Sequence, residues 1–337
     1  MRLIEFIKNL ERVNALSKHE QLVLGIMDAI NSGHLKVGSQ LPSINVMVDE
    51  VGFARKTIVK AYEELKDKGL VESKKTKGYF VISNKTDVYL KIALIMYSFQ
   101  RFQQEFYNAL RKELEDKVQI DVFFHHNNDE VFETIFSNIN GKYGMYIVAP
   151  IIGEKSKKIL KTLSPEKLIV VDRFLDLGPD YTYVTQEFKE STYAILEKLM
   201  PKIKKYKRLV LFYRDDMDYP TGTLESLKNF ASHNQLTLNI SKNYESNSLS
   251  KDVMYFVISD SDLWLLLKDC KDRDFRIGKD VGVLSFNDHI VKELISGGIT
   301  TISTDFKQMA VTTAQNIRAL SFSKRIISTD LIERESM

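Results

Sequence analysis

Residues 17–82 carry an ordered series of helix, turn and strand signals that few folds can accommodate. Ser17 and Glu20 have the spacing of a capping box, and apolar residues then recur at helical intervals. Ser43 is placed to cap a second short helix, which Gly52 ends. The series therefore begins with two helices joined by a turn.

A third helix is predicted at 55–68, with Gly69 as its stop signal. Two short strands follow at 70–72 and 79–82, on either side of a lysine-rich tip. This order is the outline of a winged helix-turn-helix. The second helix of the helix-turn-helix pair places side chains in the DNA major groove.

Local charge agrees with this interpretation. Residues 54–85 hold nine basic and four acidic residues, in a chain whose formal net charge is only +3. Lysine and arginine release counterions from phosphates, so binding would weaken strongly with salt. A basic helix and hairpin can also be a plain solvated face, and winged helices also serve as protein-interaction modules. The ordered motif series favours DNA binding.

These residues resemble the N-terminal domain of gluconate-repressor-type (GntR) transcription regulators. The matching motifs are Leu41-Pro42-Ser43, Ala54-Arg55-Lys56-Thr57-Ile58, Ala61-Tyr62-Glu63-Glu64-Leu65, Gly69-Leu70-Val71 and Gly78-Tyr79-Phe80-Val81. Asn45 and Val59 stand where that family often has arginine, so we expect weaker anchoring to the DNA backbone. The resemblance implies double-stranded operator DNA as a partner. The expected contacts are Ser43, Asn45, Arg55, Lys56, Thr57, Lys60, Lys75, Lys77 and Gly78.

Beyond a short polar stretch, apolar strands alternate with amphipathic helices. Strands are predicted at 89–97, 118–124, 143–149, 167–172, 208–213, 236–241, 253–258 and 280–286. Helices are predicted at 102–116, 129–139, 154–163, 187–200, 222–234, 261–270, 289–296 and 306–320. The alternation favours an α/β body of parallel sheets with helices on both faces, arranged as two lobes. We expect a DNA-binding domain at 1–83, a linker at 84–88, and an effector-binding and dimerisation domain at 89–337.

The body resembles the effector domain of lactose-repressor-type (LacI) regulators. The motifs are Ile169–Arg173, Val257–Asp260, Asp280–His289, Gly298–Ile302 and Leu331–Ser336. This resemblance implies a periplasmic-binding-protein-like fold with a sugar in the cleft between two lobes. A GntR-type head on such a body is the arrangement of arabinose-responsive repressors.

Ligands of open α/β sheets bind beyond the carboxyl ends of the strands. Planar polar side chains and aromatic rings are the groups that suit a sugar there. The candidate effector contacts are Tyr97, Arg101, Phe102, Asp172, Arg173, Tyr219, Asp260, Asn287 and Asp288. By resemblance, Asn287 takes the place of a ligand-binding aspartate. Each candidate could instead be a loop polar group or an ion pair. Few cations are visible among them, which favours an unphosphorylated monosaccharide.

Other features limit the alternatives. The single cysteine, Cys270, excludes an intrachain disulfide and fits a reducing cytoplasm. The N-terminal stretch 1–16 predicts an amphipathic helix and no signal peptide, and no apolar run could span a membrane. His125 and His126 are adjacent, so on a strand they face opposite ways and predict no metal site. We expect no cofactor.

Two readings of function remain. The first is a cytoplasmic, homodimeric regulator, a repressor of a carbohydrate-use operon, whose operator affinity falls when a sugar binds. The alternative is a DNA-binding head fused to an enzyme-like or non-sugar-binding body. An aminotransferase-like body would need more length, and no phosphate loop or catalytic constellation is visible.

Overall fold

The structure is a computed structural model that describes residues 3–10, 17–86, 90–114, 118–215, 217, 219–319 and 323–337. Parts of several predicted segments lie outside the described residues: 1–2 and 11–16 of the N-terminal helix, 87–88 of the linker, 89, 115–116 and 320. The chain divides into two compact units. One comprises Met1–Phe99, Tyr107–Tyr183 and Val311–Ser323, and the other comprises Gln100–Phe106, Val184–Ala310 and Lys324–Met337.

Residues 3–10 and 17–81 form a winged helix-turn-helix, called the head. Its elements are α1 (Leu3–Leu10), α2 (Lys18–Asn31), α3 (Ile44–Val51), α4 (Arg55–Asp67), β1 (Val71–Lys74) and β2 (Gly78–Val81). The predicted capping box is present, with Glu20 accepting from the Ser17 amide at 2.8 Å. Gly52 ends α3 at φ 71°, a left-handed conformation that favours glycine. Strands β1 and β2 pair antiparallel as the wing.

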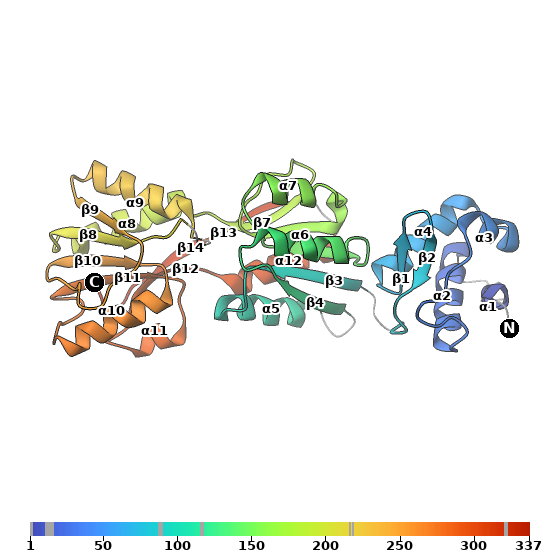
Figure 1. Cartoon of the computed structure of the whole chain (residues 1–337), viewed down its shortest axis with the longest axis horizontal. Helices are drawn as coiled ribbons and strands as arrows, with labels where there is room; N and C mark the ends of the chain where they lie inside the picture. The colour runs from blue at the N-terminus through green and yellow to red at the C-terminus, as the bar shows by residue number, and fades with distance from the viewer. Residues whose placement is uncertain are drawn as a thin grey trace. The chain divides into compact units, whose positions relative to one another are not determined.

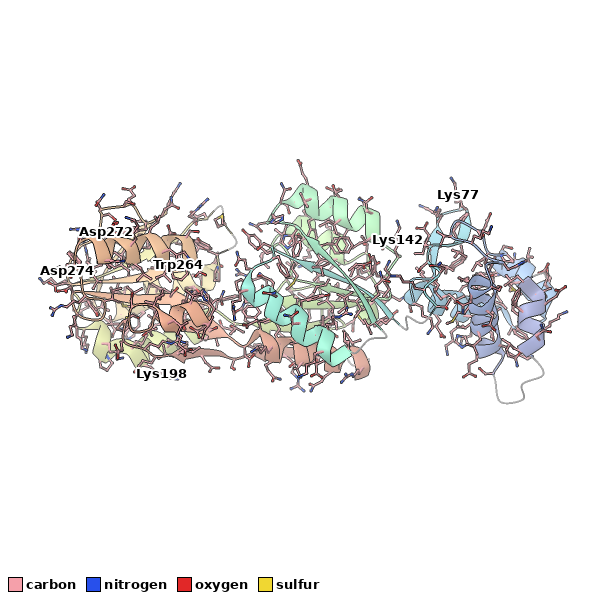
Figure 2. All side chains as sticks on the ribbon, turned by 90° about the horizontal axis from the view of Figure 1, so that it is seen from below. Lys77, Lys142, Lys198, Trp264, Asp272 and Asp274 are labelled. Atoms are coloured by element: carbon pink, nitrogen blue, oxygen red, sulfur yellow. The ribbon has the colours of Figure 1, made fainter. Side chains whose placement is uncertain are left out.

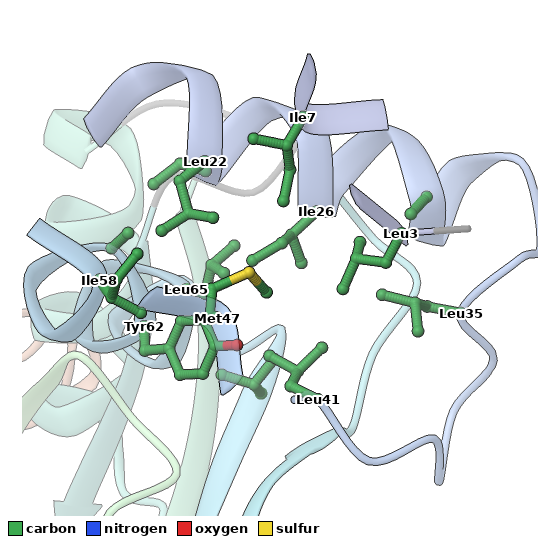
Figure 3. Close-up of a cluster of buried hydrophobic side chains, with 14 of the residues drawn as sticks. Leu3, Ile7, Leu22, Ile26, Leu35, Leu41, Met47, Ile58, Tyr62 and Leu65 are labelled. Carbon is green, nitrogen blue, oxygen red and sulfur yellow. The ribbon is translucent and has the colours of Figure 1, made fainter. Parts of the chain in front are cut away.

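The head has its own hydrophobic core (Figure 3). Ile7 of α1, Ile26 of α2, Met47 of α3, and Tyr62 and Leu65 of α4 are completely buried. Apolar residues at helical spacing in each segment supply one buried side per helix. Packing of these side chains therefore holds together the helices that the sequence predicted.

The first lobe is built on a six-stranded sheet with the order β13-β7-β6-β5-β3-β4. Figure 1 labels β3, β4, β7 and β13 of this sheet. Its strands are β3 (Leu90–Met96), β4 (Val118–Phe124), β5 (Met145–Val148), β6 (Leu168–Asp172), β7 (Thr182–Gln186) and β13 (Lys324–Ile327). Its helices are α5 (Arg101–Leu114), α6 (Asp129–Ile139), α7 (Glu154–Leu160), a 3-10 turn at Pro165–Lys167, and α12 (Phe306–Ala319). Strand β3 runs parallel to both β4 and β5.

The second lobe is built on another six-stranded sheet, ordered β14-β12-β11-β10-β8-β9. Its strands are β8 (Arg208–Phe212), β9 (Thr237–Ser241), β10 (Val253–Val257), β11 (Val281–Phe286), β12 (Thr300–Thr304) and β14 (Thr329–Ile332). Its helices are α8 (Lys189–Ile203), α9 (Thr221–His233), α10 (Asp260–Asp272) and α11 (Ile290–Leu294). Strand β14 pairs antiparallel with β12, whereas β8 to β12 pair parallel.

Alternate residues of the central strands enter two different cores in the second lobe. Met254 and Phe256 pack with α8 and α9, whereas Val253, Tyr255 and Val257 pack with α10. Every residue of β10 is buried, which is why this strand reads as a continuous apolar run. The prediction of parallel sheets covered on both faces is confirmed.

Four strands were not predicted from the sequence, namely β7, β12, β13 and β14. They are short, and threonine or charged residues interrupt their apolar pattern. The predicted helix at 187–200 also extends further, because α8 continues past Pro201 to Ile203. No helix in the described part of the chain has the length and apolar character to cross a membrane.

Candidate functional site

One side of α4 displays basic residues. Arg55, Lys56 and Lys60 are exposed, whereas Tyr62 is fully buried. The Tyr62 hydroxyl donates to the Pro42 carbonyl at 2.9 Å, which ties α4 to the start of α3. Burial of one side of the helix therefore orients the three basic side chains outward.

The paired helices bring two predicted DNA contacts together. The Arg55 guanidinium donates to Oδ1 of Asn45, which joins the start of α4 to α3. Ser43 has a structural task, because its hydroxyl accepts from the Val46 amide at 3.3 Å and caps α3. Thr57 is half-buried in the first turn of α4. The sequence did not predict the contact between Arg55 and Asn45.

The wing tip presents two more of the predicted lysines. Lys75 and Lys77 are exposed, and Figure 2 shows Lys77 pointing away from the head. Gln40, which sequence reasoning missed, donates from Nε2 to the Lys77 carbonyl at 2.6 Å. Gly78 follows at φ 96°, where a side chain would be strained. The tip is therefore held in place by Gln40 and by a glycine turn.

Acidic residues of the head pair with lysines of the first lobe in the same unit. Lys167 forms ion pairs with Asp67 and with Glu63, the latter at 3.7 Å. Lys142 pairs with Glu72 of β1 at 3.6 Å. Burial raises the pKa of Asp67, and the hydrogen bond from Lys167 opposes that rise. These contacts pair three acids of the head with lysines from outside it.

Aromatic side chains gather at the carboxyl ends of β3 and β4. The Tyr97 ring lies 6.5 Å from the His126 ring, and the Phe99 ring lies 5.9 Å from Phe124. Phe124 also approaches His126, at 6.3 Å between ring centroids. Tyr97 was predicted as an effector contact, whereas the other three rings were not. Phe99 is 59% exposed, so this edge offers an aromatic surface to a ligand.

His125 is a structural histidine. Its Nδ1 accepts from the Asn127 amide at 3.1 Å, which leaves the proton on Nε2 for the Ala149 carbonyl at 3.0 Å. Burial lowers the pKa of His125 to about 4, so the ring is neutral at physiological pH. Both nitrogens are committed within the protein. Among the described residues, no group of three or more potential ligands could hold a metal ion.

Asn287 stands at the carboxyl end of β11 in an unusual conformation. Its φ is 57°, in the left-handed region, and its Oδ1 is buried without a hydrogen-bond partner among the described residues. Asp172, at the carboxyl end of β6 in the first lobe, has φ 64°. Strained backbone and unpaired buried polar atoms concentrate at functional sites. Both residues were predicted as effector contacts.

The Asp288 carboxylate is occupied by a neighbouring segment. Arg334 donates to its two oxygens at 2.7 and 2.9 Å, and Thr301 donates at 2.9 Å. Burial alone would raise the pKa of Asp288, but these hydrogen bonds hold it below its usual value. Asp288 therefore fixes the C-terminal segment to the loop after β11. Sequence reasoning missed Arg334 as its partner.

Asp260, the first residue of α10, is also paired. Lys292 lies 2.8 Å from its Oδ1, and His289 lies 3.1 Å from its Oδ2. The His289 Nδ1 accepts from the Val291 amide at 3.2 Å, so its Nε2 carries the proton that Asp260 accepts. Lys292 is completely buried. The carboxylates of Asp260 and Asp288, at the carboxyl ends of strands in the second lobe, are therefore both balanced by cations or hydrogen-bond donors.

The remaining predicted effector residues lie in varied surroundings. Arg101 is exposed and pairs with Glu105 at 3.6 Å, and the Phe102 ring packs on Phe306 at 4.9 Å. Tyr219 lies beside Tyr213, whose hydroxyl donates to the Tyr219 carbonyl at 3.2 Å. Arg173 is half-buried and directly follows Asp172. Their contact with an effector stays a prediction.

A winged helix-turn-helix joined to two parallel-sheet lobes defines a two-part class of protein: a DNA-binding head on a ligand-binding body. Residues 18–81 match the model of the gntR family of bacterial regulatory proteins. Residues 204–337 match the periplasmic binding protein-like domain. The chain therefore combines a GntR-family helix-turn-helix domain with a periplasmic-binding-protein-like domain.

Curated relatives match about a fifth of this chain. An uncharacterized HTH-type transcriptional regulator of Bacillus subtilis, YdfD, is 34% identical over 74 residues, 22% of this chain. The probable rhizopine catabolism regulatory protein MocR of Rhizobium meliloti is 32% identical over 72 residues, 21% of this chain. In each case, the match spans only 15% of the relative's length.

Solved structures match the body. A LacI family transcriptional regulator from Lactobacillus casei with bound glucose has a TM-score of 0.62 at 15% identity, covering 73% of this chain and 99% of that one. The Escherichia coli transcriptional repressor ascG has a TM-score of 0.60 at 14% identity, covering 73% and 98%. A periplasmic binding protein/LacI transcriptional regulator from Alkaliphilus metalliredigens, complexed with D-xylulofuranose, has a TM-score of 0.59 at 13% identity. The match covers 73% of this chain and 98% of that one. The body therefore has the LacI-type fold.

Proposed function

We propose that this chain is a cytoplasmic transcription regulator whose head binds operator DNA and whose body binds a small neutral sugar. The proposal that the body binds an effector depends on one observation at Asn287. Its buried amide oxygen lacks a partner among the described residues, at the sheet edge where such folds bind ligands. An unsatisfied buried acceptor is costly, so a ligand hydroxyl that donates to it gains affinity.

The paired carboxylates favour an uncharged ligand. Asp260 and Asp288 are held by Lys292, His289 and Arg334, whereas the amide oxygen of Asn287 has no hydrogen-bond partner among the described residues. The aromatic rings at the end of β3 and β4 suit the apolar face of a sugar. Glucose and D-xylulofuranose in structures of the same fold add support for this class.

A thermal-shift screen tests the effector. D-glucose, D-xylose, D-xylulose, L-arabinose and sucrose are compared with glucose 6-phosphate and xylulose 5-phosphate. We expect one free sugar to raise the melting temperature and the phosphorylated sugars to have no effect, since a ligand of the native state stabilises it. Selective stabilisation by a phosphorylated sugar would contradict a neutral effector. No response to any sugar would contradict the sugar assignment.

The head's role is tested with DNA. Selection from random duplexes should recover a specific operator sequence, and footprinting on that sequence should locate the protected bases. As a repressor released by its effector, the protein should lose operator affinity when the stabilising sugar is added. The loss should equal the ratio of the sugar's affinities for the DNA-free and the operator-bound protein. Higher operator affinity with sugar would reverse the sign of regulation. Recovery of no sequence would contradict operator binding.

We further propose that two copies associate through α10 and α11 of the second lobe. Both helices carry exposed apolar side chains, and the Trp264 ring lies 6.0 Å from the ring of His289, which directly precedes α11. Figure 1 labels the two helices in the second lobe, and Figure 2 labels Trp264 on α10. The residues of this patch are Trp264, Leu265, Ile290, Val291 and Leu294, each between 37% and 74% exposed. A symmetric dimer would bury such a patch against itself and suit a palindromic operator.

Leu294, the most exposed residue of the patch at 74%, gives the sharpest test. Leu294→Glu should turn a dimer into a monomer in light scattering coupled to gel filtration. Ile240→Glu is the matched control, because Ile240 is 44% exposed on β9, away from the patch. A dimer that survives Leu294→Glu would place the interface elsewhere.

A further inference from the structure

Lys292 is an ionisable residue that is completely buried in the second lobe. Its Nζ lies 2.7 Å from the Phe286 carbonyl oxygen and 2.8 Å from that of Asn287. It also lies 3.0 Å from Oγ of Ser285 and 2.8 Å from Oδ1 of Asp260. An ammonium group taken from water needs such compensation, because burial disfavours its charge. Four oxygens therefore surround one cation beneath the loop that follows β11.

These contacts clamp the backbone of Asn287 from both sides. Its N–H donates to the Ile302 carbonyl at 2.7 Å, and its carbonyl accepts from Lys292. Ser285, another contact of Lys292, donates to the Val257 carbonyl at 3.1 Å, which joins the end of β11 to β10. The left-handed backbone of Asn287 persists only if its surroundings hold it. Lys292 supplies part of that hold.

Lys292 also sets the charge at this edge. Asp260 is 45% exposed on its side chain and accepts from both Lys292 and His289. Without the ammonium group, the Asp260 carboxylate would keep only the His289 ring as a partner. A negative edge would favour a different ligand from the neutral amide of Asn287. Lys292 thus contacts both the backbone of Asn287 and the carboxylate of Asp260.

We propose that Lys292 is a positioning residue for effector binding, which holds the Asn287 amide in its binding orientation and cancels the charge of Asp260. This inference rests on the proposed effector role of Asn287. Lys292 would contact no effector atom itself. Its replacement should therefore alter affinity only through Asn287 and Asp260.

The first test needs no effector. Hydrogen exchange is measured on the full-length protein, comparing wild type with Lys292→Met and with the control Lys268→Met, an exposed lysine paired with Asp272. Loss of the clamp should speed exchange of the Asn287 and Asp288 amides about tenfold, the equivalent of one hydrogen bond. The control should leave them unchanged. Wild-type exchange in a folded Lys292→Met protein would overturn the proposal.

A second variant guards against misfolding. Lys292→Met leaves Asp260 short of a cation, so Lys292→Met with Asp260→Asn removes that charge while the loop carbonyls still lack their donor. Faster exchange at residues 287–288 in this double variant supports the clamp. Wild-type exchange there rejects it.

The third test separates positioning from general stability. D-glucose, D-xylose, D-xylulose and L-arabinose are titrated by calorimetry into wild type, Asn287→Ala, the Lys292→Met/Asp260→Asn variant and the triple variant. Positioning predicts about tenfold weaker binding in the double variant and no further loss once Asn287 is alanine. Additive losses would overturn it. If no sugar binds wild type, the sugar assignment fails, and the exchange experiment still decides whether Lys292 fixes the loop.

Discussion

Asp172 and Asn287 hold the same left-handed backbone at the carboxyl end of a parallel strand, one in each lobe. Their φ angles are 64° and 57°. Aspartate and asparagine tolerate this region better than other residues with a side chain, but the conformation still costs free energy. The surrounding structure must hold each residue in this conformation, and substitution at Asn287 tests what that conformation serves.

Asn287→Ala and Asn287→Gly separate the amide from the backbone. Both remove the side-chain amide, so both should abolish the sugar-induced thermal shift. Glycine accepts φ 57° without strain, whereas alanine does not, so the glycine variant should be about 1 kcal/mol more stable to urea than the alanine variant. A sugar response retained in both variants would remove Asn287 from the effector site.

The buried imidazole of His125 should make stability depend on pH. Burial lowers its pKa to about 4 from an ordinary value of 6.5, so the unfolded chain binds a proton that the folded state refuses. Stability from this group is complete above pH 6.5 and is lost as pH falls from 6.5 towards 4, by about 3 kcal/mol.

Urea unfolding of wild type and His125→Gln between pH 4 and pH 8 measures this effect. The variant should lack the loss between pH 6.5 and pH 4 that wild type shows. His233→Gln, at an exposed position on α9, should behave like wild type. Parallel pH curves for wild type and His125→Gln would mean that His125 titrates normally.

The wing lysine Lys77 should contact phosphate without reading sequence. Its side chain is exposed at the tip, and its carbonyl is held by Gln40. Lys77→Ala should weaken binding to the selected operator and to a mixed-sequence duplex alike. It should also reduce the slope of log affinity against log salt by about 1. Lys268→Ala, in the second lobe, serves as the control in the same anisotropy titrations. An unchanged slope for Lys77→Ala would mean no phosphate contact.

The Arg334–Asp288 pair should be worth far more than a surface pair. Its side chains are only 13% and 19% exposed, and Arg334 donates to both carboxylate oxygens. Arg334→Met leaves a partly buried carboxylate without its cation and should cost about 3 kcal/mol of unfolding free energy. Arg318→Met breaks the more exposed pair with Glu113, at 3.7 Å, and should cost under about 1 kcal/mol. Equal losses in denaturant melts would contradict this ranking.

Much of the head could be predicted because its signals are local. The capping box of Ser17 and Glu20, the cap at Ser43 and the left-handed Gly52 each act within one helical turn, so a short segment specifies them. The central strands were equally visible, since a strand buried on both faces must be apolar along its length. The strands β12 and β14 were missed. Polar residues interrupt their sequences, and they form strands because they pair with segments further away in the chain.

The places of the candidate residues at strand ends could be predicted, but their partners could not. Sequence alone determined that Asn287, Asp288 and Asp260 follow strands, and parallel strands bring such residues to one edge. Only the tertiary structure decided which of them is paired with another side chain. Arg334, 46 residues away in sequence, occupies Asp288, and the buried Lys292 occupies Asp260. A local pattern cannot specify such pairings, because the partner of a buried charge is chosen by the packing that excludes water around it.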